Sequence, residues 1–263
     1  MTIDHIGVFL DFNKYYILRI IGRIAMPLFV FLVIQGALKT SNKKKYAIRL
    51  AIYSALTAIV LAIMTAIGGT LLTIALSGNI FIDLLLLILS VYILESDNKK
   101  IKPLIALPFL YMIFTYVTTR IEGCGCHGIF YWFPPALRSQ YSLHSYFLGI
   151  SLYSAIKFAP LYVKKYAPQE TNNEEYIQGI TNIFCFIAIL FVTILLAVSN
   201  FLWAEQYKFM LDSVSSYSLL AGLFILFYSG KRGYNSKWFK VAYYLYYPVH
   251  VSIISLIFFL IGV

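Results

Sequence analysis

Long apolar segments, separated by short polar or basic ones, make up nearly the whole chain. A helix that crosses a bilayer needs about 20 predominantly apolar residues. Eight segments come close to that length: 16–38, 47–68, 71–94, 103–119, 143–162, 179–203, 214–229 and 241–262. Residues 1–10 are also apolar but too short to span. The pattern predicts an all-α fold, a polytopic transmembrane helix bundle of about eight full spans plus a short N-terminal segment. We expect residues 1–263 to form a single integral-membrane domain.

One predicted span is interrupted by polar and helix-breaking residues. Ser77-Gly78-Asn79 falls inside the apolar segment 71–94, and weak helix formers at membrane depth indicate a break that lines a cavity or a new helix start. Asp83 follows Asn79 by four residues, so a helix places both on one face. A carboxylate among leucines needs a partner or a proton, and Arg19 or Arg23 is the expected partner. Asp83 could therefore line a functional site or form a structural ion pair between helices.

The composition supports a membrane protein. The chain is 60% hydrophobic and 12% charged, with a mean hydropathy of +0.79, whereas soluble domains carry roughly 25% charged residues. The formal net charge of +10 is typical of basic loops that face an anionic cytoplasmic leaflet, and no nucleic-acid partner is expected. We expect a multi-pass protein of the cell membrane, in contact with the lipid bilayer and without a separate signal peptide.

Basic residues alternate between the predicted loops. They gather around Lys44, Lys99, Lys164 and Lys231, while the intervening loops hold few. Because basic loops stay in the cytoplasm, this set is expected there. His5 and Arg19 then fall toward the outer half of the membrane.

Ionisable side chains in the first two apolar segments are costly, at roughly 2.5 to 3.5 kcal/mol for each charge in the bilayer. Asp4 and His5 lie in the first, and Arg19 and Arg23, spaced to share one helix face, lie in the second. They form either a chemical site or anchors at the water interface. His250, in the last span, is expected to be a supporting polar residue, since a lone histidine in a bundle usually makes an interhelical hydrogen bond.

Several familiar motifs are absent from the sequence. It has no phosphate-binding Gly-rich loop, no Gly-x-Ser-x-Gly elbow and no His-Glu-x-x-His pair, which argues against an ATP-driven pump, a serine hydrolase and a zinc protease. Cys124, Cys126 and His127 supply only three ligands, and Cys185 lies in a separate span. No metal site is predicted.

Four segments, in this order, resemble the TraX family. They are Ile3-Asp4-His5-Ile6-Gly7, residues 18–49 with their Gly-Arg-x-Ala-x-Pro element, residues 79–95, and residues 243–254 with a Tyr-Pro-x-His element. The resemblance covers roughly the first hundred residues and the C-terminus. The resemblance implies that the chain is a membrane acyltransferase. The family is named for the enzyme associated with N-terminal acetylation of conjugative pilin.

The family pattern assigns roles to particular residues. Asp4 and His5 match its Asp-His pair, which makes His5 the implied general base, with Asp4 holding or charging the imidazole. Arg19, Arg23 and Asn79 match positions that are polar in the pattern, and His250 matches its Tyr-Pro-x-His element. Together with Asp83, these residues are the expected binding positions for substrate or donor, and the two arginines are expected to bind donor phosphates or stabilise a developing oxyanion. Because Asp4 and His5 are consecutive, they point about 100° apart on a helix, and the partner of His5 could instead be Asn79, Asp83 or His250. This chain departs from the pattern at Gln35, where a glutamate is expected, at Asp83, where a threonine is expected, and in its short first helix.

The resulting hypothesis is an integral membrane acyltransferase that moves an acetyl group from acetyl-CoA to a hydroxyl or amine at the extracytoplasmic face. Its partners would be the acyl-CoA donor and a membrane-proximal acceptor, and an oligomer is possible. The charges at membrane depth also fit a transporter or flippase. The short first helix also fits a non-catalytic membrane partner protein.

Overall fold

The computed structural model describes residues 1–10, 12–75, 78–123, 133–202, 215–231, 233–234 and 236–261, and all of its regular elements are helical. The α-helices are α1 (Thr2–Phe9), α2 (Phe12–Gly22), α3 (Ala25–Lys39), α4 (Lys43–Ala75), α5 (Ile80–Leu94), α6 (Ala106–Gly123), α7 (Ser142–Tyr166), α8 (Glu174–Leu202), α9 (Leu220–Leu226) and α10 (Lys237–Ile261). Short 3-10 helices are Lys102–Ile105, Pro135–Leu137, Pro168–Glu170 and Ser215–Leu219.

The predicted all-α polytopic bundle is confirmed. Within the described residues, six helical stretches are long and apolar enough to cross a membrane: Tyr16–Lys39, Lys43–Ile67, Lys102–Thr119, Ser142–Tyr166, Glu174–Val198 and Lys237–Ile261. The other two predicted spans correspond to shorter apolar helices, Ile80–Leu94 and Tyr217–Leu226.

One predicted boundary is wrong. Gly68 and Gly69 were expected to separate two spans, but α4 runs through both and ends at Ala75. Glycine weakens a helix by only about 1 kcal/mol, which a long apolar helix tolerates. Gly78 and Asn79, part of the stretch where the sequence predicted a break, lie outside any helix, and α5 begins directly after Asn79.

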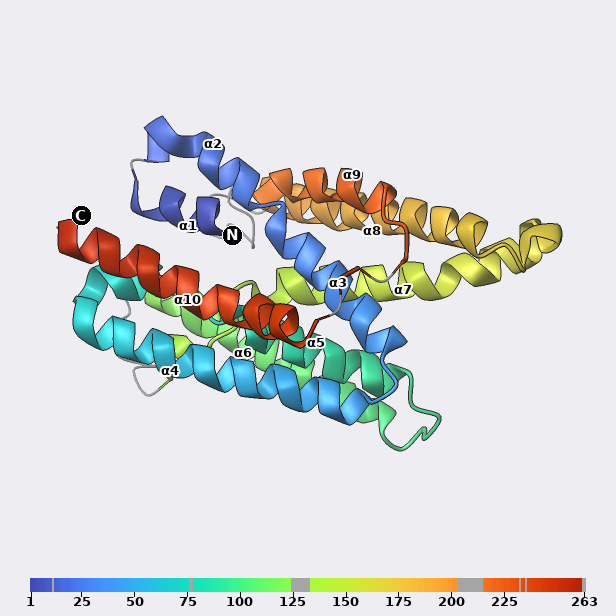
Figure 1. Ribbon diagram of the computed structural model, residues 1–263, viewed down its shortest axis with the longest axis horizontal. Coiled ribbons are helices and arrows are strands. Elements are labelled where there is room, and N and C mark those ends of the chain that lie inside the picture. The colour runs from blue at the N-terminus through green and yellow to red at the C-terminus, as the bar shows by residue number, and fades with distance from the viewer. Residues whose placement is uncertain are drawn as a thin grey trace.

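The long helices run along one common direction, with α1 and α2 at one end of the molecule (Figure 1). The α3–α4, α5–α6 and α7–α8 connections, in or beside which Lys43, Lys99 and Lys164 lie, are toward the opposite end. A hydrogen bond of 3.2 Å from Lys39 Nζ, at the end of α3, to the Gly230 carbonyl links α3 to the loop between α9 and α10. The predicted clustering of basic loops at one end therefore agrees with the fold.

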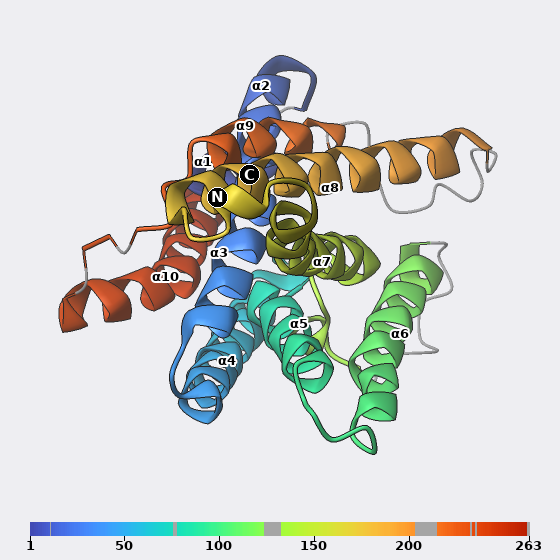
Figure 2. The ribbon, with the colours of Figure 1, turned by 90° about the vertical axis from the view of Figure 1, so that its right-hand side faces the viewer.

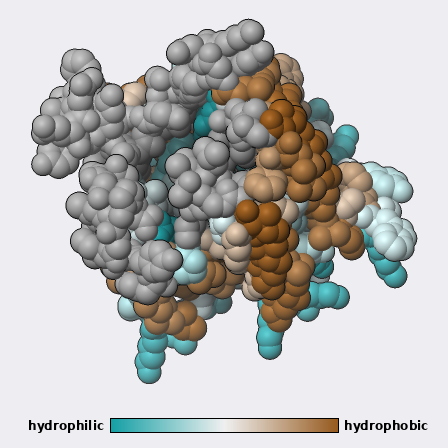
Figure 3. Space-filling view, turned by 90° about the vertical axis from the view of Figure 1, so that its left-hand side faces the viewer, coloured by the Kyte–Doolittle hydropathy of each residue, from teal (hydrophilic) through white to brown (hydrophobic). Residues whose placement is uncertain are grey.

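Helix α3 lies in the middle of the bundle, with α4, α5, α7, α9 and α10 around it (Figure 2). Its Val30, Phe31 and Ile34 belong to a buried cluster that also draws on α4, α5, α7 and α8. Outward-facing side chains are largely apolar, as with Val249, Ile253 and Leu260 on α10, and hydrophobic areas cover much of the surface seen in Figure 3. An apolar surface of this kind suits contact with lipid.

Candidate active site between the first and last helices

Helices α1 and α10 bring two histidines into direct contact. His5 Nδ1 lies 3.0 Å from His250 Nε2, and the two rings stack with centroids 5.0 Å apart and planes inclined by 20°. Both side chains are buried. A hydrogen bond between the Thr2 and Tyr246 hydroxyls links the same helices one turn away. His250 is thus the partner of His5, one of the alternatives that the sequence left open.

The hydrogen bonds fix which nitrogen of each ring carries a proton. His250 Nδ1 lies 2.6 Å from the Tyr246 carbonyl oxygen, which can only accept, so His250 is protonated on Nδ1. In a neutral His250 the Nε2 atom is then an acceptor, and His5 donates to it from Nδ1. Burial, reinforced by the adjacent His250, lowers the pKa of His5 in α1, which favours its neutral form. The neutral pair therefore leaves an unprotonated Nε2 on His5.

Asp4 does not hold the His5 imidazole as expected. Its carboxylate accepts hydrogen bonds from Arg19 Nη1 at 2.8 Å and from Arg23 Nη2 at 2.5 Å, so guanidinium groups from α2 and from the residue that directly follows it converge on Asp4. Gly22 permits this approach, because a Cβ atom at that position would lie 2.2 Å from Asp4 Cβ. The three charges fix α1 against α2 and thereby set the position of His5.

The predicted pairing of Asp83 with Arg19 or Arg23 is wrong. Asp83 is buried and accepts Ser139 Oγ at 2.6 Å, Ser145 Oγ at 2.5 Å, the Gln140 N–H at 2.7 Å and the Tyr141 N–H at 3.2 Å. Ser139, Gln140 and Tyr141 directly precede α7 and Ser145 lies in its first turn; the first backbone N–H of the helix, that of Ser142, donates to Ser139 Oγ at 2.7 Å. A carboxylate there satisfies open backbone donors and complements the helix dipole. Asp83 thus caps α7 from another helix, which removes the need for a cation.

Asn79 also has a structural position. Its side-chain oxygen accepts the Phe81 N–H at 3.0 Å, which caps α5. Its side-chain nitrogen donates to the Ser54 carbonyl of α4 at 2.9 Å, and its backbone N–H donates to the Arg138 carbonyl at 2.9 Å. Asn79 and Asp83 therefore hold the segment 133–142 rather than joining the cluster of Asp4, His5, Arg19, Arg23 and His250.

Two residues that the sequence did not single out connect these clusters. The Tyr247 hydroxyl donates to Gln140 Oε1 at 3.0 Å, and the Tyr247 ring lies edge-on to both His5 and His250. Tyr247 lies in a tyrosine-rich stretch, residues 243–247, where no local pattern distinguishes it from its neighbours. No sequence spacing relates it to Gln140, 107 residues away.

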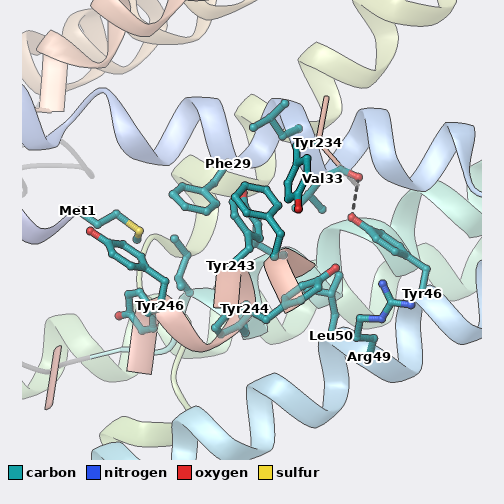
Figure 4. Close-up of a pocket in the computed structure, with 16 residues that line it drawn as sticks. Met1, Phe29, Val33, Tyr46, Arg49, Leu50, Tyr234, Tyr243, Tyr244 and Tyr246 are labelled. Atoms are coloured by element: carbon teal, nitrogen blue, oxygen red, sulfur yellow. Dashed lines mark hydrogen bonds between the residues drawn. The ribbon is translucent and has the colours of Figure 1, made fainter. Parts of the chain in front are cut away.

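A cavity of about 330 Å³ lies between α3, α4, α5 and α10 (Figure 4). Met1 and Tyr247 line it where it approaches the histidine pair, and Arg49 lines it toward the basic loops. Six tyrosines contribute to its walls: Tyr46, Tyr234, Tyr243, Tyr244, Tyr246 and Tyr247. The Arg49 guanidinium lies over the Tyr244 ring, 5.9 Å from its centroid. The cavity thus offers apolar walls with hydroxyl groups and one cation, which suits an elongated amphipathic ligand.

The prediction that Cys124, Cys126 and His127 bind no metal concerns residues outside the described ones. Across the described parts of the chain, no group of three or more His, Cys, Asp or Glu side chains is arranged to hold a metal ion.

Comparisons with known proteins agree with the family suggested by the sequence. The TraX protein family model matches residues 1–168, a range that includes His5, the two arginines that bind Asp4, and Asp83. No curated protein and no solved structure matches the chain. The matched range covers more than half of the 263 residues, and the chain therefore belongs to the TraX family.

Proposed function

We propose that this chain is an integral membrane acyltransferase that moves an acetyl group from acetyl-CoA to a hydroxyl or amine at the extracytoplasmic face of the cell membrane. The observation that carries the proposal is the buried His5–His250 pair, whose hydrogen bonds assign a free Nε2 to His5, together with the amphipathic cavity that Tyr247 lines while its ring contacts both histidines. Membership of the TraX family supports the same chemistry.

His5 is the proposed general base. Its Nε2 takes the proton of the acceptor hydroxyl or amine as the acceptor's oxygen or nitrogen attacks the thioester carbonyl. The tetrahedral intermediate then collapses, the carbon–sulfur bond breaks, and the departing thiolate takes the proton from His5 to give free CoA. While His5 is an imidazolium, its Nδ1–H donates to His250 Nε2, and the Tyr246 carbonyl holds His250 in the tautomer that can accept.

The cavity is the proposed place for the donor arm. A pantetheine arm carries two amides on an otherwise apolar chain, and tyrosine hydroxyls can donate to and accept from amides. Arg49 and the basic loop before it would attract the phosphates of CoA. This assigns Arg49 the phosphate-binding role first expected of Arg19 and Arg23, whose guanidinium groups bind Asp4.

Substitution of His5 tests the base. The variant His5→Gln keeps a hydrogen-bonding group but cannot accept a proton at Nε2, so we expect transfer from labelled acetyl-CoA to fall about 10²–10⁴-fold. Expression and thermal unfolding of the purified variant should stay close to the parent. His250→Ala should weaken transfer less, because it removes the partner and leaves the base. Transfer by His5→Gln within about threefold of the parent would exclude the role of His5.

The transporter and partner-protein alternatives give a different result in the same experiment. A transporter would bind or move its solute without consuming acetyl-CoA, and a non-catalytic partner would do neither. Absence of any acetyl-CoA binding or turnover by the parent protein, tested in a bilayer with membrane extracts as the acceptor source, would favour them over the acyltransferase.

A further inference from the structure

Two hydrogen bonds connect the Asp83 cap to the helix that carries His250. The Gln140 backbone N–H donates to Asp83 Oδ2 at 2.7 Å, and the Gln140 side-chain oxygen accepts the Tyr247 hydroxyl at 3.0 Å. Tyr247 lies three residues before His250, so the two side chains share one face of α10. One glutamine thus joins a buried loop to the wall of the histidine pair.

Tyr247 contacts both members of the pair through its ring. Its centroid is 5.9 Å from that of His5, with the planes inclined by 66°, and 5.6 Å from that of His250, inclined by 78°. Edge-to-face contacts of this kind depend on ring orientation. A tyrosine held at its hydroxyl cannot change its tilt freely, and the position of its ring limits where the two imidazoles can lie.

Gln140 is itself fixed from two sides. Asp83 binds its backbone N–H and is held in turn by Ser139 and Ser145. Gly78 packs against its backbone so closely that an added Cβ would lie 2.5 Å from Gln140 Cα. The backbone that carries the acceptor of the Tyr247 hydroxyl is therefore anchored on two sides.

We propose that Gln140 and Tyr247 are positioning residues, and that through them the Asp83-capped start of α7 holds the His5–His250 pair in its hydrogen-bonded geometry. The inference rests on the proposed function only for its effect on catalysis. The geometric claim stands independently, because it concerns the reactivity of His5 itself. Asp83, where the family pattern has threonine, acts on the site through this connection and not as a site wall.

Chemical modification of His5 tests the geometric claim without an acyl-transfer assay. Diethyl pyrocarbonate acylates unprotonated imidazole nitrogen, and mass spectrometry of the full-length protein in lipid nanodiscs gives the rate at His5. Tyr247→Phe and Gln140→Leu each remove the same hydrogen bond and retain similar bulk. We expect each to raise the rate at His5 about threefold to tenfold, as expected for loss of one buried hydrogen bond.

A double variant and a matched control make the result specific. Tyr247→Phe combined with Gln140→Leu should change the rate no more than either alone, because both remove one shared interaction. Tyr153→Phe removes a part-buried hydrogen bond of 2.6 Å from a tyrosine hydroxyl to Glu95, away from the histidine pair. This variant should leave the rate of modification at His5 unchanged. Parental rates in both single variants, or a double variant that multiplies the two single effects, would overturn the proposal.

Kinetic assays of acetyl transfer by the same variants separate the positioning proposal from the proposed function. If the chain transfers acetyl groups, Tyr247→Phe should lower kcat about threefold to tenfold with little change in KM for acetyl-CoA. A fall in kcat without a change in His5 labelling would count against positioning. A change in labelling without any transferase activity in the parent would support positioning and remove the proposed function.

Discussion

Two buried aspartates in this molecule are stabilised in opposite ways. Asp4 faces two guanidinium groups, one from α2 and one from the residue directly after it, whereas Asp83 is surrounded by two serine hydroxyls and two backbone N–H groups. Asp4 fixes one helix against another through charge. Asp83 fixes a loop and the start of a helix through neutral donors. The comparison teaches that a carboxylate in an apolar helix predicts a need for donors, without predicting whether those donors are charged.

The difference should appear most strongly when each charge is removed. Asp4→Asn leaves Arg19 and Arg23 facing an amide in a largely buried setting, and loss of one partner of a buried ion pair costs about 3–5 kcal/mol. We expect a large fall in the free energy of unfolding, measured by denaturant titration in detergent. Asp97→Asn, at an exposed position, is the matched control. An equal, small effect for both would show that the arginines do not depend on Asp4.

A smaller loss is expected for the second aspartate. Asp83→Asn keeps the shape of the side chain but replaces one acceptor oxygen with a donor that faces other donors. The cost should be about 1–3 kcal/mol, that of leaving buried groups unsatisfied. The same denaturant titration gives the value. A loss greater than that of Asp4→Asn would reverse the comparison and indicate an unrecognised charge partner for Asp83.

The smallest effect belongs to an acid near the surface. Glu95 accepts the Tyr153 hydroxyl and pairs with Lys157, whose side chain is 52% exposed. The Tyr153 hydrogen bond, with help from Lys157, lowers the pKa of Glu95. Its contribution is therefore present above the ordinary glutamate pKa and is lost as the pH falls through the lowered folded value. Glu95→Gln should lower the free energy of unfolding by about 0–1 kcal/mol at neutral pH. In strong acid the two proteins should be equally stable, because Glu95 is then protonated. An undiminished difference between the two proteins well below pH 4 would contradict this assignment.

The sequence predicted the helices well because apolar length is a strong signal of a membrane span. It also predicted that the helix is interrupted near Gly78 and Asn79, which lie outside any helix. It misplaced a boundary at Gly68 and Gly69, since the penalty for glycine is small against the gain from a continuous helix.

The candidate site was predicted in its members but not in its pairings. His5 and His250 matched a family pattern, and an i, i+4 spacing placed Arg19 and Arg23 on one face. The partner of each charge depends on which helices meet, and no local pattern encodes that. Gln140 carries no sequence signal at all, because its role arises from a backbone donor and a side-chain acceptor that point to different helices.

The histidine pair joins residues 245 positions apart, which has a consequence for how the protein is made. Membrane helices enter the bilayer in order as the chain is synthesised, so α1 and its charged contacts with α2 are in place long before α10 exists. His5 must wait for the last helix before it finds its partner. Until then the proposed base lacks the hydrogen-bond partner that holds its imidazole in place.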